Sequence, residues 1–107
     1  ETMMLIRHVQ FTIKPGKMEQ YWQIAKGAEA QASAMDGVVK THRFVDPDNP
    51  NTLFAYVEFD NEEAAAALQA SPLMKEYGAK ISPLIESWDV YMQYTVSKAE
   101  SLKPLNE

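Results

Sequence analysis

The sequence predicts an α+β fold, a four-stranded antiparallel sheet with helices on one face, in the order β-α-β-β-α-β. Three observations indicate this fold: apolar residues alternate in four segments, helical spacing replaces the alternation in two places, and turn-forming residues lie between. The chain has 107 residues, of which 46% are hydrophobic and 23% charged, and this length and composition are typical of one globular domain with a single hydrophobic core. We therefore expect a single domain over residues 1–107, with its core at about 4–95 and a tail at 96–107.

The first strand is expected over residues 4–13, where apolar and polar side chains alternate. The alternation sorts them into two faces, one with Leu5, Val9, Phe11 and Ile13 and the other with His8, Gln10 and Thr12. After a Lys14-Pro15-Gly16-Lys17 break, helical spacing runs from Met18 to Met35. Gly37 ends this helix, because glycine accepts the left-handed conformation at little steric cost.

A hairpin is expected next. Residues 38–45 are rich in strand-forming types, residues 46–51 are six turn-formers, and residues 52–59 alternate again. The last segment places Leu53, Ala55, Val57 and Phe59 opposite Phe54, Tyr56 and Glu58.

The second helical region is expected in two pieces. Asp60 or Asn61 can cap a first helix that carries residues 64–68, and Ser71-Pro72 starts a second that lasts until Pro83. A final strand follows over residues 87–96, with one side formed by Trp88, Val90, Met92 and Tyr94. This order matches the ferredoxin-like arrangement.

The sheet face away from the helices is expected to be covered by protein. Its side chains are expected to include His8, Gln10, Thr12, Tyr56, Glu58, Tyr91 and Gln93. Met4, Ile6, Phe54 and the tyrosines make this face too apolar and aromatic to be simply solvated. We therefore expect a second copy of the chain to cover it, which gives a homodimer.

Composition and charge exclude several classes of function. The net charge of −5 leaves no basic surface for nucleic acid or an anionic membrane, and it disfavours long-range steering of acidic substrates. The absence of cysteine excludes disulfides, thiolate metal sites and a cysteine nucleophile. No apolar stretch approaches the roughly 18 residues that cross a bilayer. The cytoplasm is expected only as the default location. Two histidines without a nearby carboxylate pattern indicate no metal site.

Several short segments, in this order and spacing, resemble the antibiotic biosynthesis monooxygenase family of the dimeric α+β barrels. They are Ile13-Lys14-Pro15-Gly16-Lys17, Met35-Asp36-Gly37-Val38-Val39, Asp46-Pro47-Asp48-Asn49-Pro50, Tyr56-Val57-Glu58-Phe59 and Ser71-Pro72-Leu73-Met74. The resemblance covers about residues 4–95. It implies a homodimer whose two four-stranded sheets meet as a barrel, with a ligand cavity in each subunit between sheet and helices. Ile6-Arg7-His8-Val9 also resembles the sister stress-responsive A/B barrel proteins, some of which are cyclases.

The resemblance implies a cofactor-independent monooxygenase acting on a small aromatic ligand, a quinol or a polyketide-like phenol. Such a substrate reduces oxygen itself, so the protein needs chiefly a dry, planar pocket. The candidate substrate-binding residues are Trp22, Phe59, Met74, Tyr77 and Trp88, with Val9, Phe11 and Leu68 beneath. The alternative is that these residues simply form the core.

The candidate catalytic residues are His8 and Arg43. His8 is suited to proton exchange near neutral pH, although it faces away from Val9 and Phe11 and is equally explained as an interface histidine. Arg43 points to the opposite face from His42 and can bind an anion, or it can form an ion pair with a glutamate such as Glu58.

Two alternative functions remain open, and a third, haem degradation, is disfavoured. Met74 stands where related sequences often have histidine, so the chain can be a non-catalytic ligand-binding dimer; a cyclase or isomerase using His8 is the other alternative. The haem-degrading branch expects asparagine, tryptophan and histidine where this chain has Val9, Leu68 and Gly78. We therefore expect no haem and no other cofactor.

Overall fold

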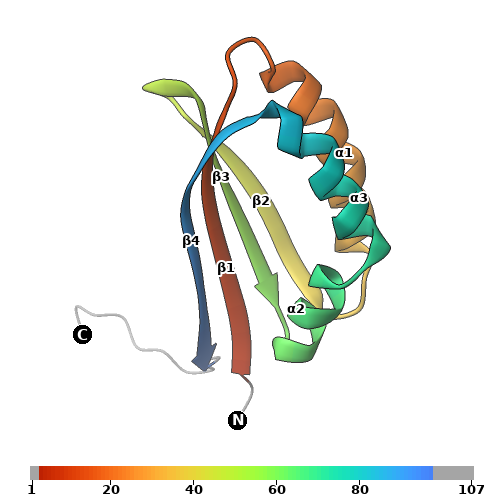
Figure 1. Cartoon of the computed structure of the whole chain (residues 1–107). Helices are drawn as coiled ribbons and strands as arrows, with labels where there is room; N and C mark the ends of the chain where they lie inside the picture. The colour runs from red at the N-terminus through yellow and green to blue at the C-terminus, as the bar shows by residue number, and fades with distance from the viewer. Residues whose placement is uncertain (1–2, 98–107) are drawn as a thin grey trace, which may run out of the picture.

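The four strands form one antiparallel sheet in the order β2-β3-β1-β4, and the helices lie against one of its faces (Figure 1). The computed structural model describes residues 3–97; the expected tail lies outside the described residues from residue 98 on. The elements are β1 (Met3–Ile13), α1 (Met18–Ser33), β2 (Val38–Asp46), β3 (Asn49–Phe59), α2 (Glu62–Gln69), α3 (Pro72–Ile81), the 3-10 turn η1 (Ser82–Leu84) and β4 (Ile85–Ser97). The predicted α+β ferredoxin-like arrangement is confirmed.

Local capping positions the helices over the sheet. Asn61 Oδ1 accepts a hydrogen bond of 2.8 Å from the Ala64 amide at the start of α2. Ser71 Oγ accepts one of 3.3 Å from the Met74 amide at the start of α3, where Pro72 occupies the first turn. The chain thus breaks and restarts between α2 and α3, as the sequence predicts. Within residues 3–97, no helix has the length and apolar character needed to cross a membrane.

The β2–β3 hairpin is tighter than expected. Strand β2 continues through Asp46 and β3 begins at Asn49, so only residues 47–48 form the turn and the expected six-residue turn is wrong. The Asp46 carboxylate accepts hydrogen bonds from the Asp48 amide at 2.9 Å and from Asn49 Nδ2 at 3.3 Å. These contacts hold the hairpin tip closed, with Asp46 paired to Asn49 next to the turn. A register shift separates this pair from the next one, Val45 and Leu53.

A β-bulge in β4 changes which side chains reach each face. Gln10 pairs with Val90 and Phe11 with Trp88, which leaves Asp89 as an extra residue. Thr12 Oγ1 and Ser87 Oγ each donate to the Asp89 carboxylate at 2.7 Å. The bulge places Trp88 on the helix-covered face.

Two expectations about β4 are therefore wrong. Tyr91 pairs with Val9 and Gln93 with Arg7, so both lie on the helix side of the sheet and not on the open face. The open face instead receives Val90, Met92 and Tyr94, which the sequence pattern had grouped with Trp88. A strict two-residue alternation fails here because the bulge inserts one residue.

The core consists of two clusters of buried side chains beneath the helices. One contains Phe11, Ile13, Tyr21, Ala25, Leu53, Ile81, Leu84 and Ile85. The other contains Leu5, Ala32, Phe59, Ala65 and Leu68. Within residues 3–97, no helix covers the sheet face opposite these clusters (Figure 1).

Candidate functional site

A cavity of about 160 Å³ lies between the sheet and helices α1 and α3, bounded by members of both core clusters. Its apolar lining is formed by Val9, Phe11, Ala28, Ala32, Ala55, Val57, Leu68, Met74, Ile81 and Trp88. Its polar lining includes Arg7, Glu29, Thr41, Arg43 and Tyr77. An apolar hollow with a few convergent polar groups is the usual form of a small-molecule site.

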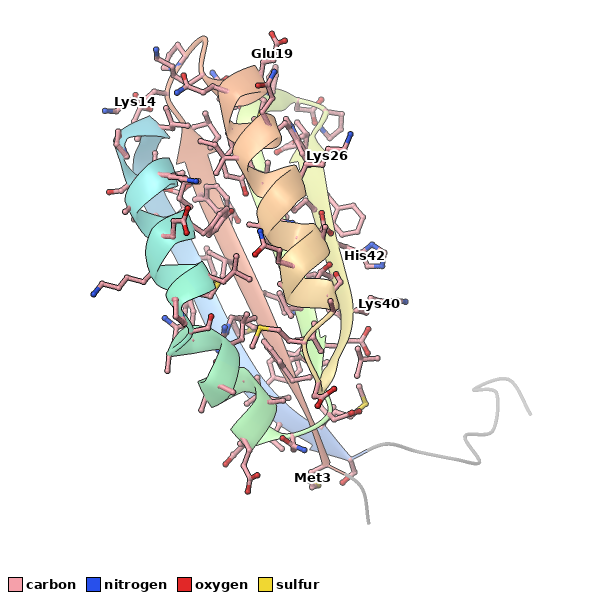
Figure 2. All side chains as sticks on the ribbon, turned by 90° about the vertical axis from the view of Figure 1, so that its right-hand side faces the viewer. Met3, Lys14, Glu19, Lys26, Lys40 and His42 are labelled. Atoms are coloured by element: carbon pink, nitrogen blue, oxygen red, sulfur yellow. The ribbon has the colours of Figure 1, made fainter. Side chains whose placement is uncertain are left out.

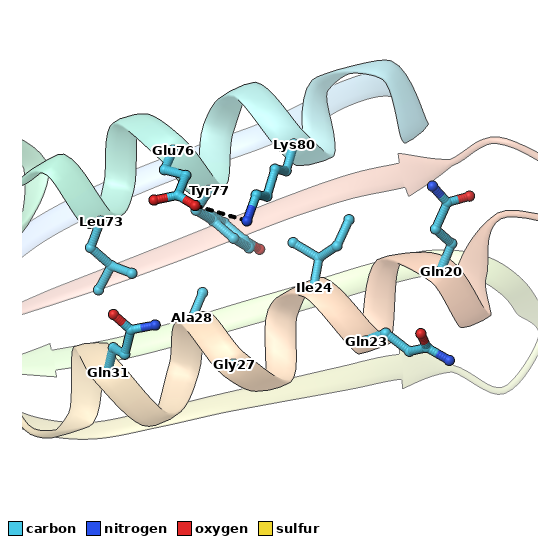
Figure 3. A pocket seen from close by; sticks show the side chains of 10 residues that line it. All are labelled: Gln20, Gln23, Ile24, Gly27, Ala28, Gln31, Leu73, Glu76, Tyr77 and Lys80. Carbon is cyan, nitrogen blue, oxygen red and sulfur yellow. Dashed lines mark ion pairs between the residues drawn. The ribbon is translucent and has the colours of Figure 1, made fainter.

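A second hollow, of about 400 Å³, lies between α1 and α3 on the outer surface (Figure 3). The exposed Glu76–Lys80 ion pair, 2.8 Å long, lies within it, and glutamines form much of its α1 side. Tyr77 points from α3 between the two helices and lines both hollows. We take the inner cavity as the candidate site because its lining is predominantly apolar, whereas the outer groove is more open and has a larger share of polar surface.

Arg43 and Tyr77 belong to the polar wall of the inner cavity, and the fully buried Tyr21 lies behind them. The Tyr21 and Tyr77 hydroxyls lie 2.7 Å apart, and Arg43 Nε donates to the Tyr21 hydroxyl at 3.1 Å. Arg43 also lies over the Tyr77 ring, 5.9 Å from its centroid. Helix α1 thus contributes Tyr21, α3 contributes Tyr77 and β2 contributes Arg43.

Glu29 on α1 neutralises the positive charge of Arg43. Arg43 Nη1 forms an ion pair of 3.0 Å with Glu29 Oε2, with side-chain exposures of 13% and 30%. Thr41 Oγ1 donates to Glu29 Oε1 at 2.8 Å. The expected ion pair between Arg43 and a glutamate is thus observed, but with Glu29. Glu58, the example expected from the sequence, is not the partner, because it lies opposite Ile6 and Lys40 on the other face of the sheet. The ion pair fixes Arg43 and leaves it little net charge for a ligand.

Burial sets the protonation of Tyr21 and Arg43. Burial raises the pKa of Tyr21 far above its ordinary value, and the neighbouring Tyr77 adds to this effect. Burial lowers the pKa of Arg43, but the Tyr21 and Tyr77 hydroxyls beside it outweigh that effect and raise it overall. Both groups keep their protons at neutral pH. They therefore serve as fixed hydrogen-bond donors and not as a base.

Arg7 lies at another part of the same cavity, and sequence reasoning missed it. It is only 8% exposed, and its guanidinium lies 5.1 Å from the centroid of the Phe59 ring. Nε and Nη2 donate to Gln93 Oε1 at 3.1 and 3.0 Å, and Nη1 donates to Gln69 Oε1 at 3.4 Å. A signal was available, because Arg7 interrupts the otherwise apolar face of β1 between Leu5 and Val9.

Four of the seven predicted site residues line the cavity: Arg43, Met74, Tyr77 and Trp88. Trp88 is 59% exposed and packs on Phe11 with ring centroids 5.0 Å apart, so it forms part of the mouth. Trp22 packs against the outside of the first core cluster, and Phe59 is fully buried beneath Arg7. Neither lines the cavity.

His8, the remaining candidate, lies on the opposite face of the sheet from the cavity. Its Nε2 is 3.0 Å from the Tyr94 hydroxyl, and its ring lies 5.0 Å from that of Tyr56. The orientation expected for His8 is thus observed. His42 also leaves the sheet on this side, and Figure 2 shows it projecting at the β2 edge, away from α1.

The family model for antibiotic biosynthesis monooxygenase matches residues 4–80, well over half of the chain. The chain belongs to the antibiotic biosynthesis monooxygenase family. Family membership supports a monooxygenase-like function, and it confirms the resemblance inferred from the short segments. Among proteins with curated functions, none matches the chain.

Solved structures share the fold of this antibiotic biosynthesis monooxygenase family member. A protein from Chloroflexus aurantiacus J-10-fl named for the same family is 20% identical, with a TM-score of 0.78, covering 94% of this chain and 99% of that one. Another so named, from Nitrosomonas europaea, is 13% identical with a TM-score of 0.80, covering 94% of each chain. A conserved protein from Methanosarcina mazei Go1 is 15% identical with a TM-score of 0.78, covering 92% and 95%. At these identities the likeness establishes the fold alone.

Proposed function

We propose that this protein is a cofactor-independent monooxygenase whose substrate is a small quinol or phenol bound in the inner cavity. The observation that carries the proposal is the pairing of an apolar cavity with the polar lining residues Tyr77 and Arg43, both of which are hydrogen-bonded to the buried Tyr21 behind them. Trp88 and Phe11 supply aromatic surface at the mouth, and Met74 supplies an adaptable wall.

The cavity volume favours a single-ring substrate. An apolar protein cavity of about 150 Å³ can hold benzene, and this one measures about 160 Å³. A multi-ring phenol would require the α1–α3 layer or the side chains at the mouth to move. We therefore propose a monocyclic quinol or phenol as the substrate.

In the proposed reaction the substrate supplies the electrons. Loss of a proton from a quinol hydroxyl makes the ring electron-rich enough to reduce oxygen. One oxygen atom replaces a hydrogen on a ring carbon, and the other leaves as water with two hydrogens of the substrate, so that a hydroquinone and O2 give a hydroxyquinone and water. The Tyr77 hydroxyl, already hydrogen-bonded to Tyr21, is placed to donate to the substrate oxygen as negative charge develops there. The apolar wall excludes water, which strengthens this interaction.

We also propose that the protein is a homodimer formed through the open face of the sheet. The open face carries large exposed apolar side chains at Phe44, Phe54, Val90, Met92 and Tyr94. So many large apolar side chains exposed on one sheet face are uncommon on a monomer. A second copy presents the same surface and can bury it symmetrically.

Oxygen consumption tests the proposed activity. Purified protein is incubated with a panel of monocyclic hydroquinones, with no added flavin, metal or haem, in an oxygen electrode and in an anaerobic control. We expect oxygen uptake and quinone formation above the uncatalysed rate. Met74→Trp fills the cavity and should abolish the enzymatic excess, whereas Lys75→Trp, at an exposed position on the same helix, should retain it. Equal rates for the wild type and Met74→Trp would rule out a reaction inside the cavity.

A non-catalytic ligand-binding dimer is the second candidate. The observation that favours it is that Met74 lines the cavity and the buried Tyr21 and Arg43 cannot act as a base at neutral pH. Ligand binding without oxygen uptake in the same panel would identify this function. A cyclase using His8 would need a different pocket, between the two sheets of the proposed dimer, because His8 faces away from the inner cavity.

A further inference from the structure

We propose that Arg7 binds a carboxylate group of the ligand, so that the natural ligand is a quinol or phenol that also carries a carboxylate. This inference rests on the proposed use of the inner cavity, but it concerns recognition and does not depend on the oxidation chemistry. It assigns a binding role to a residue on β1 at the edge of the cavity.

The burial of Arg7 is the first argument. Its exposure is 8%, and it lies in the middle of the helix-covered face of β1, over the Phe59 ring. Moving a charged group from water into the protein interior is costly unless a counter-charge or several hydrogen bonds compensate for it. A guanidinium retained at such a place needs a compensating interaction.

The second argument is the absence of a counter-charge. Within residues 3–97, no carboxylate forms an ion pair with Arg7; its partners are the neutral amide oxygens of Gln93 and Gln69. Arg43, the other arginine at the cavity, differs because Glu29 neutralises it at 3.0 Å. The cavity therefore contains one paired and one unpaired cation, and an anionic ligand is attracted to the unpaired one.

The third argument is the geometry of the guanidinium. Gln93 Oε1 occupies the Nε and Nη2 side at 3.1 and 3.0 Å, whereas Nη1 has only a 3.4 Å contact with Gln69. Both amide oxygens belong to side chains that can rotate away. A carboxylate that replaced the weaker contact would form charge-assisted, two-pronged hydrogen bonds with the fork.

Arg7 is also reachable from outside. Besides the inner cavity, it lines a shallow opening of about 610 Å³ between α2 and β4, with Gln69, Tyr91 and Gln93. Glu62 also lines this opening, but within residues 3–97 it forms no ion pair with Arg7. A carboxylate at Arg7 would leave the ring of the ligand in the apolar cavity, where Tyr77 supplies a second polar contact. The net charge of −5 lowers the rate at which acids arrive, but it does not remove this short-range contact.

A matched pair of ligands tests the proposal. The dissociation constants of 4-hydroxybenzoate and 4-hydroxybenzamide, which differ chiefly in charge, are measured by titration calorimetry and ligand-observed NMR. We expect the wild type to bind the benzoate at least about tenfold more tightly, the lower range for a hydrogen bond to a charged group. Arg7→Gln should bring the ratio near one while the amide binds as before. Lys75→Gln, which removes an exposed positive charge on α3, should keep the wild-type ratio.

Four results would overturn the proposal. The first three concern affinity: a ratio of the two dissociation constants near one in the wild type, binding of neither compound, or a wild-type ratio preserved in Arg7→Gln. The fourth is dissociation of a wild-type dimer by Arg7→Gln, which would mean that a second copy of the chain compensates the charge of Arg7. If Arg7→Gln does not fold, Arg7→Lys decides, because lysine keeps the charge without the planar fork and should lower the ratio severalfold; an unchanged ratio contradicts the inference. Turnover is not involved. Anion preference without oxygen uptake would refute only the monooxygenase activity, and oxygen uptake without anion preference would refute only the role of Arg7.

Discussion

Arg43 on β2 forms its ion pair with Glu29 on α1, at 3.0 Å, and so joins the sheet to the helix layer beside the cavity. Breaking a largely buried pair leaves one charge without its partner, which is more damaging than losing an exposed pair. We expect Glu29→Gln to lower the free energy of unfolding by about 2 kcal/mol, a value reduced for the partial exposure of Glu29.

Urea denaturation of the wild type and Glu29→Gln measures this effect. Glu76→Gln is the matched control, because it breaks the exposed ion pair with Lys80 on α3 and should leave the urea midpoint nearly unchanged. Equal midpoints for the two variants would contradict a structural role for the Arg43–Glu29 pair.

The raised pKa of Tyr21 predicts a loss of stability at alkaline pH. Burial raises the pKa above the unfolded value of 10.0, so between the two values the folded state holds a proton that the unfolded state releases. The contribution of Tyr21 to the free energy of unfolding is therefore fully present below pH 10. Above pH 10 the free energy of unfolding falls by up to about 1.4 kcal/mol per pH unit for one such group.

Urea denaturation between pH 8 and pH 11.5, on the wild type and Tyr21→Phe, measures this dependence. The variant should be less stable at pH 8, because Arg43 and Tyr77 lose a hydrogen-bond partner, but its stability should fall less steeply with pH. Identical slopes would show that Tyr21 does not hold its proton in the folded state.

Local sequence signals predicted much of the fold, because they act over a few residues. Asn61 and Ser71-Pro72 begin α2 and α3 through hydrogen bonds to amides three residues away, so their effect is readable without tertiary structure. The bulge at Asp89 depends instead on how β4 pairs with β1 and on the Thr12 hydroxyl, 77 positions away. Period-two alternation carried past that point assigned Tyr91 and Gln93 to the wrong face.

The site was partly predictable for the same reason. Met74, Tyr77 and Trp88 were found because their types and elements suit a pocket wall. The Glu29 partner of Arg43 was missed because it depends on how α1 lies across β2, a tertiary relationship that no spacing within either element records. Arg7 was overlooked although its position in an apolar alternation was visible.

Gly37 is predicted to be required where the chain passes from α1 into β2. Its φ is +84°, and a Cβ added there would overlap the Cβ of Ala64 in α2. Gly16 has a similar φ of +78° but no atom within 4 Å of such a Cβ. Gly16→Ala should therefore cost only the left-handed backbone strain, about 1–2 kcal/mol, and Gly37→Ala should cost more.

Thermal and urea unfolding of the two glycine variants isolate the contribution of the close approach of α2. The difference between them reports the displacement of Ala64, since the backbone term is nearly common to both. A Gly16→Ala variant as unstable as Gly37→Ala would show that α2 moves away without appreciable cost.

The proposed dimer predicts a change of mass when charge is placed on the open face. Phe44 is exposed on β2, where it pairs with Phe54, and both belong to the apolar surface that a second copy would cover. Phe44→Asp would bury a carboxylate in this apolar interface, which opposes association. We expect light scattering to give twice the chain mass of 12.1 kDa for the wild type and the mass of a single chain for Phe44→Asp.

Val45→Asp is the matched control. It replaces the next exposed apolar residue, which faces the other side of the sheet, and should remain dimeric. A wild type that stays at 12.1 kDa at micromolar concentration would refute the dimer and leave the exposed surface for another partner.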